Sequence, residues 1–499
     1  MTLAANKTKL VCTIGPASES PGILRRMLDA GMNVARLNFS HGEFAWHKTA
    51  IDNLRLAARS AGRQLTIMAD LPGPKIRIGS LAGEPVELKK GDTFTLTTDE
   101  VPGDRRRVFV NFPRLPAVVK PGGCIFLNDG NIRLEVVRVS GSDVDCRVLV
   151  GGELRSRKGL NLPGMNLGVC AFTKRDRECL MFALENGVDT VSQSFIETPA
   201  DVDAVRKAAA EMGHRPFIIA KIERAGALAH IDEILKAADG IMVARGDLGV
   251  ETPIERIAAV QKQLIGKANL LGKPVITATQ MLESMVDHFL PTRAEATDVA
   301  NAILDGTDCV MLSEESAMGR FPVEAVAMLA KIAAAIEPCR TDARDREIFA
   351  DYDRNGDVHL ADFMSRNVQR VVVHLAPIAV IVPSATGHAA RMVSRFKLPV
   401  WIAGVSPDEA TCHGMQFSYG VHPVHEPEYP GDWSAFARNW VRGNGLPEGL
   451  VVLTEVPSQI NPEADPRLEI FDLSRKSAGK NPNSWSGQNT MPEKEGTRS

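Results

Sequence analysis

The chain has 499 residues, enough for about three domains, and its 44% hydrophobic and 24% charged residues are typical of a soluble globular protein. The net charge of −3 argues against binding of nucleic acid or membrane surfaces through bulk charge, and no long apolar run predicts a membrane span. The N-terminus lacks the apolar core of a signal peptide, and the eight cysteines are scattered without Cys-x-x-Cys pairs. We therefore expect a cytoplasmic protein in a reducing compartment.

Eight apolar runs follow along the chain, most of them separated by helix-like stretches. They occupy residues 10–16, 32–40, 65–70, 188–195, 217–224, 240–249, 273–280 and 309–313. Short, nearly continuous apolar runs are typical of buried parallel strands. Between two of them, residues 255–271 have apolar side chains at helical spacing. Alternation of strand and helix predicts right-handed parallel crossovers, and eight units predict a closed (β/α)8 TIM barrel.

The alternation stops between residue 70 and about residue 164, where Gly, Pro and Val are frequent and residues 85–98 alternate with period two. We predict a small β-barrel domain inserted after the third strand, as a lid over the barrel mouth. Further apolar runs at 378–383, 400–405 and 449–454 predict a C-terminal α/β domain. The predicted parts are 1–71 and 165–340 (barrel), 72–164 (lid), 341–475 (regulatory domain) and 476–499 (disordered tail).

Two of the apolar runs end abruptly in charge. Lys221 and Glu223 end the fifth run, and Arg245 and Asp247 lie near the end of the sixth. Barrel enzymes build their active sites at the carboxyl ends of the strands, so we expect these side chains at one mouth. Two carboxylates suit a hard divalent ion, and the two cations suit an anionic, phosphorylated substrate. One such run alone would favour surface salt bridges, but two runs favour a site.

Other runs also end in polar residues, which the barrel would bring to the same mouth. They are Arg36, Asn38, Ser40, Asp70, Ser194, Thr279, Ser313 and Glu315. This set indicates phosphoryl transfer, in which Lys221 and Arg36 offset the charge of the transferring group. Gly246 and Asp247 are expected to open a helix whose N–H groups hold a substrate carboxylate.

The chain resembles a pyruvate kinase from about Lys7 to about Ser474. The matching segments include Asn33-Val-Ala-Arg-Leu-Asn-Phe-Ser-His-Gly and Asp70-Leu-Pro-Gly-Pro-Lys-Ile-Arg. Further matches lie at residues 12–18, 158–164, 278–285, 291–295, 298–299 and 301–308. Each segment alone is weak evidence, but their number and order make a chance match improbable.

This resemblance implies transfer of a phosphoryl group from phosphoenolpyruvate to ADP, giving pyruvate and ATP. The resemblance assigns catalysis to Lys221, Thr279, Arg36 and Ser313, and substrate binding to Arg36, Lys221, Gly246, Asp247, Thr279 and Ser194. It assigns nucleotide binding to Asn38, His41, Arg77 and Lys158. The ligands of Mg2+ or Mn2+ would be Glu223 and Asp247. Lys221 would stabilise the phosphoryl group in flight. Thr279, with Ser313 and water, would help to protonate the enolate that remains. A homotetramer is implied as well.

Two other functions remain open from the residues. One is an aldolase or lyase that forms a magnesium-bound pyruvate enolate, although Arg77, Lys158 and the lid argue against it. The other is a catalytically weak paralogue that senses metabolites. By position alone, Thr279 and Ser313 would be core hydroxyls bonded to backbone, and His41 would be a surface histidine.

The chain departs from the family at the positions that hold a potassium ion in many members. Many members hold K+ on groups equivalent to Asn38, Ser40, Asp70 and the carbonyl of Leu71. Where the potassium-dependent members have Glu, this chain has Lys75, and Leu71 stands where they have Thr. A fixed ammonium group can supply the charge that the ion brings. We therefore expect Lys75 to replace K+ and the activity not to require it.

A second departure follows the eighth strand, where Glu314 stands in place of the family's usual Gly. Its carboxylate adds negative charge near a site that binds anions. If that Gly had a positive φ, Glu314 would also strain the backbone. Either the carboxylate weakens substrate affinity or it points outward without effect.

Two segments near the C-terminus resemble ligand sites. One resembles the family's effector-phosphate loop and makes Ser384, Thr386, Gly387 and His388 candidates for binding a sugar phosphate or nucleotide, although such a turn also caps helices. The other, residues 351–362, has the oxygen spacing of an EF-hand calcium loop. It ends in Asp and no second hand follows, so we interpret it as a polar interdomain loop.

Overall fold

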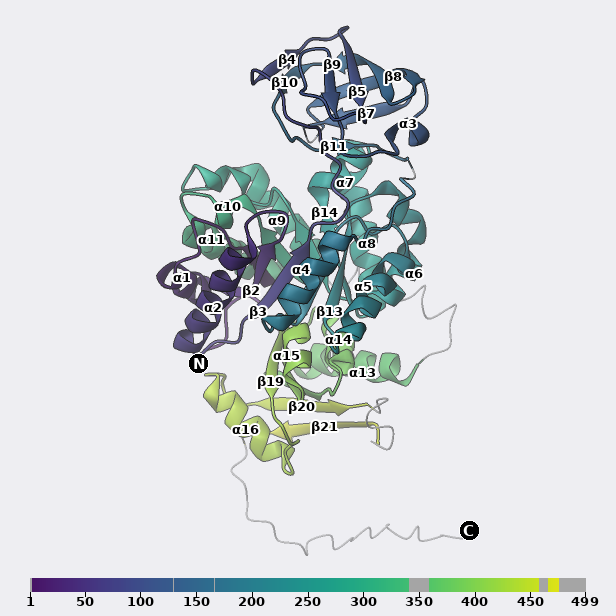
Figure 1. Ribbon diagram of the computed structural model, residues 1–499. Coiled ribbons are helices and arrows are strands. Elements are labelled where there is room, and N and C mark those ends of the chain that lie inside the picture. The colour runs from purple at the N-terminus through teal and green to yellow at the C-terminus, as the bar shows by residue number, and fades with distance from the viewer. Residues whose placement is uncertain (1, 129, 166, 341–358, 457–464, 475–499) are drawn as a thin grey trace, which may run out of the picture.

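The protein consists of three bodies in a row, with the lid at one end of the barrel and the C-terminal domain at the other (Figure 1). The computed structural model describes residues 2–128, 130–165, 167–340, 359–456 and 465–474. The first eight positions of the calcium-loop segment and the predicted disordered tail lie outside the described residues. Among the described helices, none combines the length and the apolar character that crossing a membrane requires.

The central body is the predicted barrel, and all eight apolar runs form its strands. They are β1 (Lys9–Thr13), β2 (Met32–Asn38), β3 (Thr66–Leu71), β12 (Thr190–Gln193), β13 (Phe217–Ile222), β14 (Gly240–Ala244), β15 (Val275–Ala278) and β16 (Cys309–Leu312). The parallel strands close in the order β1-β16-β15-β14-β13-β12-β3-β2. Val11, Val34, Met68, Ile219 and Met242 belong to a buried cluster from alternate positions of several strands, as expected for a filled barrel. The predicted fold class is confirmed.

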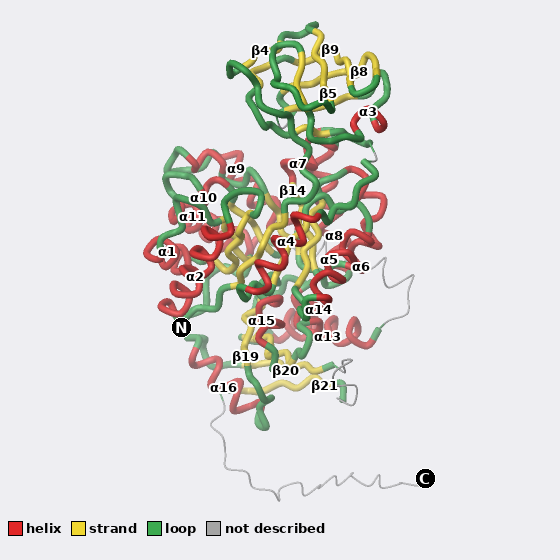
Figure 2. Tube along the Cα trace, viewed as in Figure 1, coloured by secondary structure: helices red, strands yellow, loops and turns green. Residues whose placement is uncertain are grey.

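Helices cover the outside of the strands (Figure 2). They are α1 (Pro21–Ala30), α2 (Phe44–Ala61), α4 (Lys174–Glu185), α5 (Pro199–Glu211), α6 (Ile231–Ala237), α8 (Ile257–Leu270), α9 (Arg293–Asp305) and α11 (Pro322–Ile336). Thr173, Thr198 and Thr292 start three of them with capping boxes. The helix predicted at 255–271 is α8, which begins at Ile257 because a 3₁₀ turn (Ile254–Arg256) precedes it.

The insertion after β3 forms a separate β structure with its own apolar core. Its elements are β4 (Val86–Leu88), β5 (Thr93–Thr97), β6 (Arg107–Phe109), α3 (Leu115–Val118), β7 (Cys124–Leu127), β8 (Ile132–Ser140), β9 (Asp143–Val150), β10 (Gly152–Leu154) and β11 (Leu160–Asn161). Six strands pair in the order β11-β7-β8-β9-β5-β6, and β10 pairs with β4. The chain enters through Gly73, whose φ of 67° and a Cβ position 2.8 Å from Phe195 Cδ2 require glycine.

The C-terminal domain is a five-stranded sheet with the strand order β19-β18-β17-β20-β21. Its elements are α13 (Leu360–Leu375), β17 (Ala379–Pro383), α14 (His388–Ser394), β18 (Trp401–Ser406), α15 (Glu409–Met415), β19 (Val421–His425), α16 (Trp433–Gly443), β20 (Leu450–Glu455) and β21 (Arg467–Asp472). The three predicted runs are the three central strands β18, β17 and β20 of this sheet. Strand β21 lies antiparallel to β20 at the edge.

A buried ion pair joins this domain to the base of the barrel. Lys397 Nζ lies 2.5 Å from Asp308 Oδ1, and the same oxygen accepts a hydrogen bond from the backbone N–H of Tyr419 at 2.9 Å. Burial lowers the pKa of Lys397, and Asp308 partly offsets that effect. Lys9, on β1, donates to the carbonyl of Val421 at 2.6 Å. Because Asp308 immediately precedes β16, these contacts tie the domain to the amino-terminal ends of the strands.

We expect Lys397→Met to lower the free energy of unfolding by about 3–5 kcal/mol, because it leaves the buried Asp308 carboxylate without its cation. Denaturant titration followed by circular dichroism measures the change. Lys48→Met is the control, since the exposed pair of Lys48 with Asp52 contributes less than about 1 kcal/mol. Equal stability of the Lys397 variant and the unchanged protein would contradict the assigned role of the pair.

Candidate active site

The carboxyl ends of β2, β3 and β13 bring together a buried group of alternating charges. Arg36 donates to Asp70 Oδ2 from Nε at 2.8 Å and from Nη2 at 2.5 Å. Lys221 Nζ lies 3.2 Å from Asp70 Oδ1, which also accepts the hydroxyl of Ser192 at 2.8 Å. Burial alone would raise the pKa of Asp70, but Lys221, Arg36 and these hydrogen bonds lower it to about 2. The Asp70 carboxylate is therefore ionised whenever the protein is folded near neutral pH.

Lys221 also contacts Glu223, the residue that directly follows β13. The Nζ atom lies 2.9 Å from Glu223 Oε1 and donates to the hydroxyl of Ser194 at 2.7 Å. Burial would lower the pKa of Lys221, but the Asp70 and Glu223 carboxylates outweigh it and raise the pKa. The other oxygen of Glu223 accepts the backbone N–H of Phe195 at 2.8 Å. Phe195 has a φ of 61°, an uncommon conformation for a non-glycine residue that is typical of functional sites.

The end of β14 passes directly into the short helix α7 (Arg245–Glu251), so Asp247 stands in its first turn. A carboxylate there is favoured by the partial positive charge of a helix N-terminus. The N–H of Gly246 donates to Thr279 Oγ1 at 2.8 Å, and that hydroxyl donates to the carbonyl of Ala278 at 2.6 Å. Thr279 itself has a φ of 70°. Its hydroxyl is thus held by backbone on both sides, directly beside the start of α7.

The guanidinium group of Arg245 is bonded within the protein, whereas its place at a strand end predicted contact with an anionic substrate. Its Nη1 atom lies 2.7 Å from Asp298 Oδ2, and its Nη2 atom donates to the carbonyl of Thr279 at 2.7 Å. The guanidinium group therefore fixes the chain around Thr279. The long side chain turns back toward α9, where Asp298 is located.

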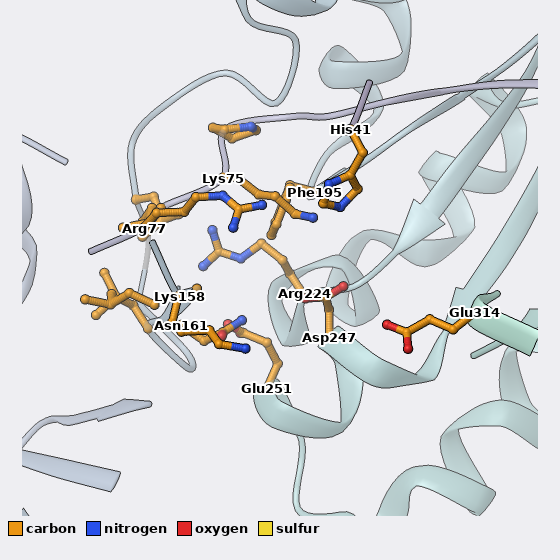
Figure 3. Close-up of a pocket in the computed structure, with 16 residues that line it drawn as sticks. His41, Lys75, Arg77, Lys158, Asn161, Phe195, Arg224, Asp247, Glu251 and Glu314 are labelled. Atoms are coloured by element: carbon orange, nitrogen blue, oxygen red, sulfur yellow. The ribbon is translucent and has the colours of Figure 1, made fainter. Parts of the chain in front are cut away.

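A pocket of about 340 Å3 lies between this mouth and the lid (Figure 3). From the lid side it is lined by Lys75, Arg77 and Lys158, and from the barrel side by Asp247 and Glu314. Other lining residues include His41, Asn161, Phe195, Arg224 and Glu251. Lys221 and Glu223 are buried and do not line it, but Phe195 connects the two through its N–H bond to Glu223. The lid side of the pocket thus carries cations, and the barrel side carries carboxylates together with Arg224.

The charges in the pocket act on one another. Lys75 is exposed to the pocket, yet the surrounding protein and then Lys221 lower its pKa, while Asp247 and Glu223 act in the opposite direction. Burial, followed by Lys75 and Arg77, lowers the pKa of His41, so its imidazole is neutral at physiological pH.

Glu314 opens the short helix α10 (Glu314–Ala317), and its side chain points into the pocket (Figure 3). Its φ is not positive, so the strain considered for this position is absent. Of the two alternatives for its carboxylate, an outward orientation is therefore not the one observed.

Comparison with known proteins agrees with this geometry. Residues 5–326 match the barrel domain of pyruvate kinase, and residues 362–446 match its alpha/beta domain. A pyruvate kinase from Thermococcus litoralis is 46% identical over 85% of this chain and 89% of its own length. The chain belongs to the pyruvate kinase family. A pyruvate kinase from Geobacillus stearothermophilus is 42% identical over 84% of this chain and 72% of its own length. The structure of a pyruvate kinase from Cryptosporidium parvum matches 94% of this chain and 96% of its own chain, with 34% sequence identity and a TM-score of 0.87.

As a pyruvate kinase, the enzyme is a phosphotransferase that acts on phosphoenolpyruvate and ADP and depends on a divalent metal. Family membership decides against the aldolase or lyase considered from the residues. The barrel, the lid and the C-terminal domain all take part in the similarity, since the matching structure covers nearly the whole chain.

Most residues predicted for the pyruvate kinase site meet at this end of the barrel. Arg36, Asp70, Ser194, Lys221 and Glu223 form one bonded cluster. His41, Lys75, Arg77, Lys158 and Asp247 line the pocket. Gly246 and Thr279 are bonded to each other, so the Gly246 N–H predicted to hold a carboxylate has a partner within the protein. The N–H of Ser313 donates to Glu315 Oε2 at 2.6 Å, which fixes the turn after β16.

The groups predicted for a potassium site are bonded within the protein. Asp70 is paired with Arg36 and Lys221, the carbonyl of Leu71 accepts the hydroxyl of Ser194 at 2.7 Å, and Asn38 Oδ1 accepts the N–H of Ser40 at 3.1 Å.

The effector candidates lie in the C-terminal domain at the opposite end of the barrel. Ser384 Oγ accepts the N–H of Ala390 at 3.4 Å, Gly387 caps α14, and Thr386 and His388 are exposed. Although part of His388 reaches solvent, the protein packed around its ring, followed by Arg391 and Lys273, lowers its pKa to about 4.

Four contributors to the site were missed from the sequence. Ser192 bonds Asp70, and the N–H of Phe195 bonds Glu223. Arg224 donates to the carbonyl of Met165 at 2.6 Å, where the chain returns from the lid, and Glu251 lines the pocket one helical turn after Asp247. Arg224 directly follows Glu223, and Glu251 lies four residues after Asp247, so both signals were present in the spacing. Nothing in the sequence marks a backbone N–H as a ligand of a carboxylate.

The depressed pKa of Asp70 predicts a pH dependence of stability. An unfolded Asp has a pKa near 3.9, so this group contributes stability above about pH 4 and loses it as the pH falls toward about 2. When the pH falls from 5 to 2.5, the free energy of unfolding of the unchanged enzyme should decrease by on the order of 2 kcal/mol more than that of the Asp70→Asn variant. Urea titrations across this range measure it. Asp29→Asn, which alters an exposed pair, should keep the original profile, and parallel profiles for Asp70→Asn would contradict the prediction.

Proposed function

We propose that phosphoryl transfer from phosphoenolpyruvate to ADP takes place where the bonded cluster around Lys221 adjoins the pocket under the lid. The observation that carries this assignment is the position of Lys221, held between Asp70 and Glu223 at the strand ends next to the pocket that Asp247 lines. A fixed ammonium group stabilises charge on a transferring phosphoryl group without reorganisation during the reaction. Arg36, oriented by Asp70, uses its remaining N–H donors on the same phosphate.

Glu223 and Asp247 are the proposed ligands of the divalent metal, which we take to be Mg2+, or Mn2+ in its place. No group of three or more His, Cys, Asp and Glu side chains suited to a metal occurs in the described residues. Two carboxylates fit Mg2+, which keeps several positions for water and substrate oxygens. When bound, the ion polarises substrate oxygens and offsets their charge. Glu223 must then share its carboxylate between the metal and Lys221.

The second half of the reaction needs a proton on the methylene carbon of the pyruvate enolate. We assign this step to Thr279, with Ser313 and water as the route to solvent. The Thr279 hydroxyl is held between the Gly246 N–H and the Ala278 carbonyl, and Arg245 fixes the surrounding chain, so its position is set before substrate binds. The start of α7 at Gly246 and Asp247, together with Ser194, would orient the substrate carboxylate and phosphate. The Gly246 N–H would then exchange its bond to Thr279 for one to the substrate.

On the nucleotide side we assign Arg77 and Lys158 of the lid and Asn38 and His41 of the barrel. Arg77 and Lys158 lie on adjacent chain segments, since Arg77 bridges to Gly159, and both line the pocket. Their charges suit the two phosphates of ADP. A neutral His41 can accept or donate one hydrogen bond without adding charge.

The family resemblance also suggests a homotetramer. An effector that carries a phosphate group would bind at Ser384, Thr386, Gly387 and His388.

Asp247→Asn tests the metal assignment. It removes one of two proposed metal ligands, so kcat/KM for ADP-dependent pyruvate formation should fall by about a thousandfold, in line with the largest single-group losses in such sites. A coupled assay of pyruvate with and without ADP measures both the activity and its nucleotide dependence. Asp232→Asn is the control, since Asp232 forms an exposed pair with Lys267. A loss of only a few-fold in Asp247→Asn would refute the metal assignment.

Potassium independence is the second proposal that can be tested directly. Because the Asp70, Asn38 and Leu71 oxygens are bonded within the protein and Lys75 already brings a positive charge, addition of K+ to potassium- and sodium-free buffer should leave the rate nearly unchanged. Lys75→Glu should lower the rate and make it respond to K+. A rise of about tenfold for the unchanged enzyme, equivalent to about 1.4 kcal/mol, would overturn the proposal.

Glu314 should raise the KM for phosphoenolpyruvate, because its carboxylate points into a pocket that binds anions. In Glu314→Gly we expect this KM to fall about threefold at low ionic strength, with a smaller change in high salt because salt screens exposed charges. Steady-state kinetics at two salt concentrations measure the effect. An unchanged KM would show that the carboxylate does not affect substrate binding.

A further inference from the structure

Each of the two chain connections between the lid and the barrel is held by a buried aspartate of the barrel. Gly73 stands on the outgoing connection, which leaves β3, and Ala171 stands on the return connection, which leads to α4. Both residues are buried, whereas Lys75 and residues 168–170, on the lid side of these two points, are exposed. The chain thus leaves the packed interior at Gly73 and enters it again at Ala171.

Asp176 holds the outgoing connection. It lies in the first turn of α4 and is fully buried. Its Oδ2 atom accepts the N–H and the hydroxyl of Thr173 at 2.7 and 2.5 Å, which completes the capping box of the helix. The cap does not need the other oxygen, Oδ1, which accepts the N–H of Gly73 at 2.8 Å, 103 residues away in the chain. One carboxylate therefore caps a barrel helix and fixes the start of the lid.

Asp201 holds the return connection in the same way. Its Oδ2 atom accepts the N–H and the hydroxyl of Thr198 at 2.9 and 3.1 Å at the start of α5. Its Oδ1 atom accepts the N–H of Ala171 at 3.1 Å. The carbonyl of Ala171 also has a partner, since it accepts Nε2 of Gln193, the last residue of β12, at 3.0 Å. The return connection is therefore held through both backbone groups of Ala171.

The cations on the lid side of the catalytic pocket lie close to these fixed points. Lys75 and Arg77 follow Gly73 by two and four residues. Arg77 also bridges to Gly159, the residue after Lys158. A shift of the outgoing connection would therefore displace all three cations together, whereas the carboxylates on the barrel side of the pocket would stay in place.

We propose that Asp176 and Asp201 are positioning residues for phosphoryl transfer, because each fixes one end of the lid and together they keep Arg77 and Lys158 facing the pocket. A hydrogen bond to an ionised carboxylate is about twice as strong as one between neutral groups. Without these two bonds the lid has more orientations, and the apparent affinity for the nucleotide falls with the fraction of molecules in which the cations face the pocket. That ADP is the substrate affected rests on the function proposed for Arg77 and Lys158.

Two double variants separate the bond to the lid from the helix cap. Asp176→Asn/Asp201→Asn leaves one accepting oxygen on each side chain, and this oxygen should stay with the cap, where at least two donors meet it. The amide NH2 group then faces the N–H of the lid connection and cannot accept from it. Thr173→Ala/Thr198→Ala is the matched control, because it removes the hydroxyl of each cap and leaves both bonds to the lid connections in place.

Hydrogen–deuterium exchange followed by mass spectrometry measures the two bonds independently of catalysis. In the double Asn variant, peptides that contain Gly73 and Ala171 should exchange at least about tenfold faster than in the unchanged enzyme, because their N–H groups have lost their acceptors. In the double Ala variant the same peptides should exchange at the original rate.

Steady-state kinetics measure the consequence for the reaction. The KM for ADP should rise at least about tenfold in the double Asn variant and less than about twofold in the double Ala variant. The KM for phosphoenolpyruvate should change less, because the ligands proposed for it belong to the barrel. Arg77→Gln should raise the KM for ADP of the unchanged enzyme but have a smaller effect in the double Asn variant, where Arg77 is already displaced.

Two results would overturn the proposal. They are unchanged exchange at both connections in the double Asn variant, and equal kinetics of the Asn and Ala variants. Faster exchange together with a higher KM for phosphoenolpyruvate, and not for ADP, would support the role of the two aspartates and refute the nucleotide assignment of Arg77 and Lys158. Thermal unfolding checks that the variants are folded, and each single Asn variant with its own Ala control gives the same test if a double variant is not.

Discussion

The pairing of Lys221 with Asp70 and Glu223 is the interaction on which the catalytic end of the protein depends. With Arg36 it forms a neutral row of alternating charges that is almost completely buried. An isolated charge in such a place would cost several kcal/mol, so each ion is acceptable only because its neighbours are there. The row draws on β2, β3 and β13, which are brought together only in the closed barrel. Closure of the barrel therefore also fixes the orientation of these charged groups.

The pocket beside this row has a different construction. Three of its cations, Lys75, Arg77 and Lys158, come from the inserted segment. Arg224 and the carboxylates Asp247 and Glu314 come from the barrel mouth. The cations of the lid and the carboxylates of the barrel attract one another across the pocket. The same division makes the site sensitive to the position of the lid. Arg224, which holds the carbonyl of Met165, limits how far the returning chain can move from the barrel.

The sequence was sufficient to predict the barrel, its eight strands and the four charged residues of the row, because parallel strands place their carboxyl ends together and charge at those ends is easy to see. It could not give the direction in which a long side chain turns. Arg245 was expected to face the substrate, but it reaches Asp298, 53 residues later, a contact that no periodicity reveals. The positive φ angles of Thr279 and Phe195 and the hydrogen bond from the Phe195 N–H to Glu223 depend on contacts between neighbouring strands. A second pocket, at the base of the barrel, is lined by two domains, so no single segment of the sequence indicates it.

The pairing of β1 with β16 sets an order of events during synthesis. Lys9 on β1 stands opposite Cys309 on β16, and a ribosome that adds about 5–20 residues per second needs about 15–60 s to make the intervening chain. Throughout that time one edge of β1 has no native partner, whereas all strands of the lid, which has its own core, have been made by residue 161. Asp308, which anchors the C-terminal domain, emerges just before β16. The nascent chain thus carries an unpaired strand edge for most of its synthesis. Such an edge can pair with another chain, so the risk of misassembly is greater during synthesis than in the closed barrel.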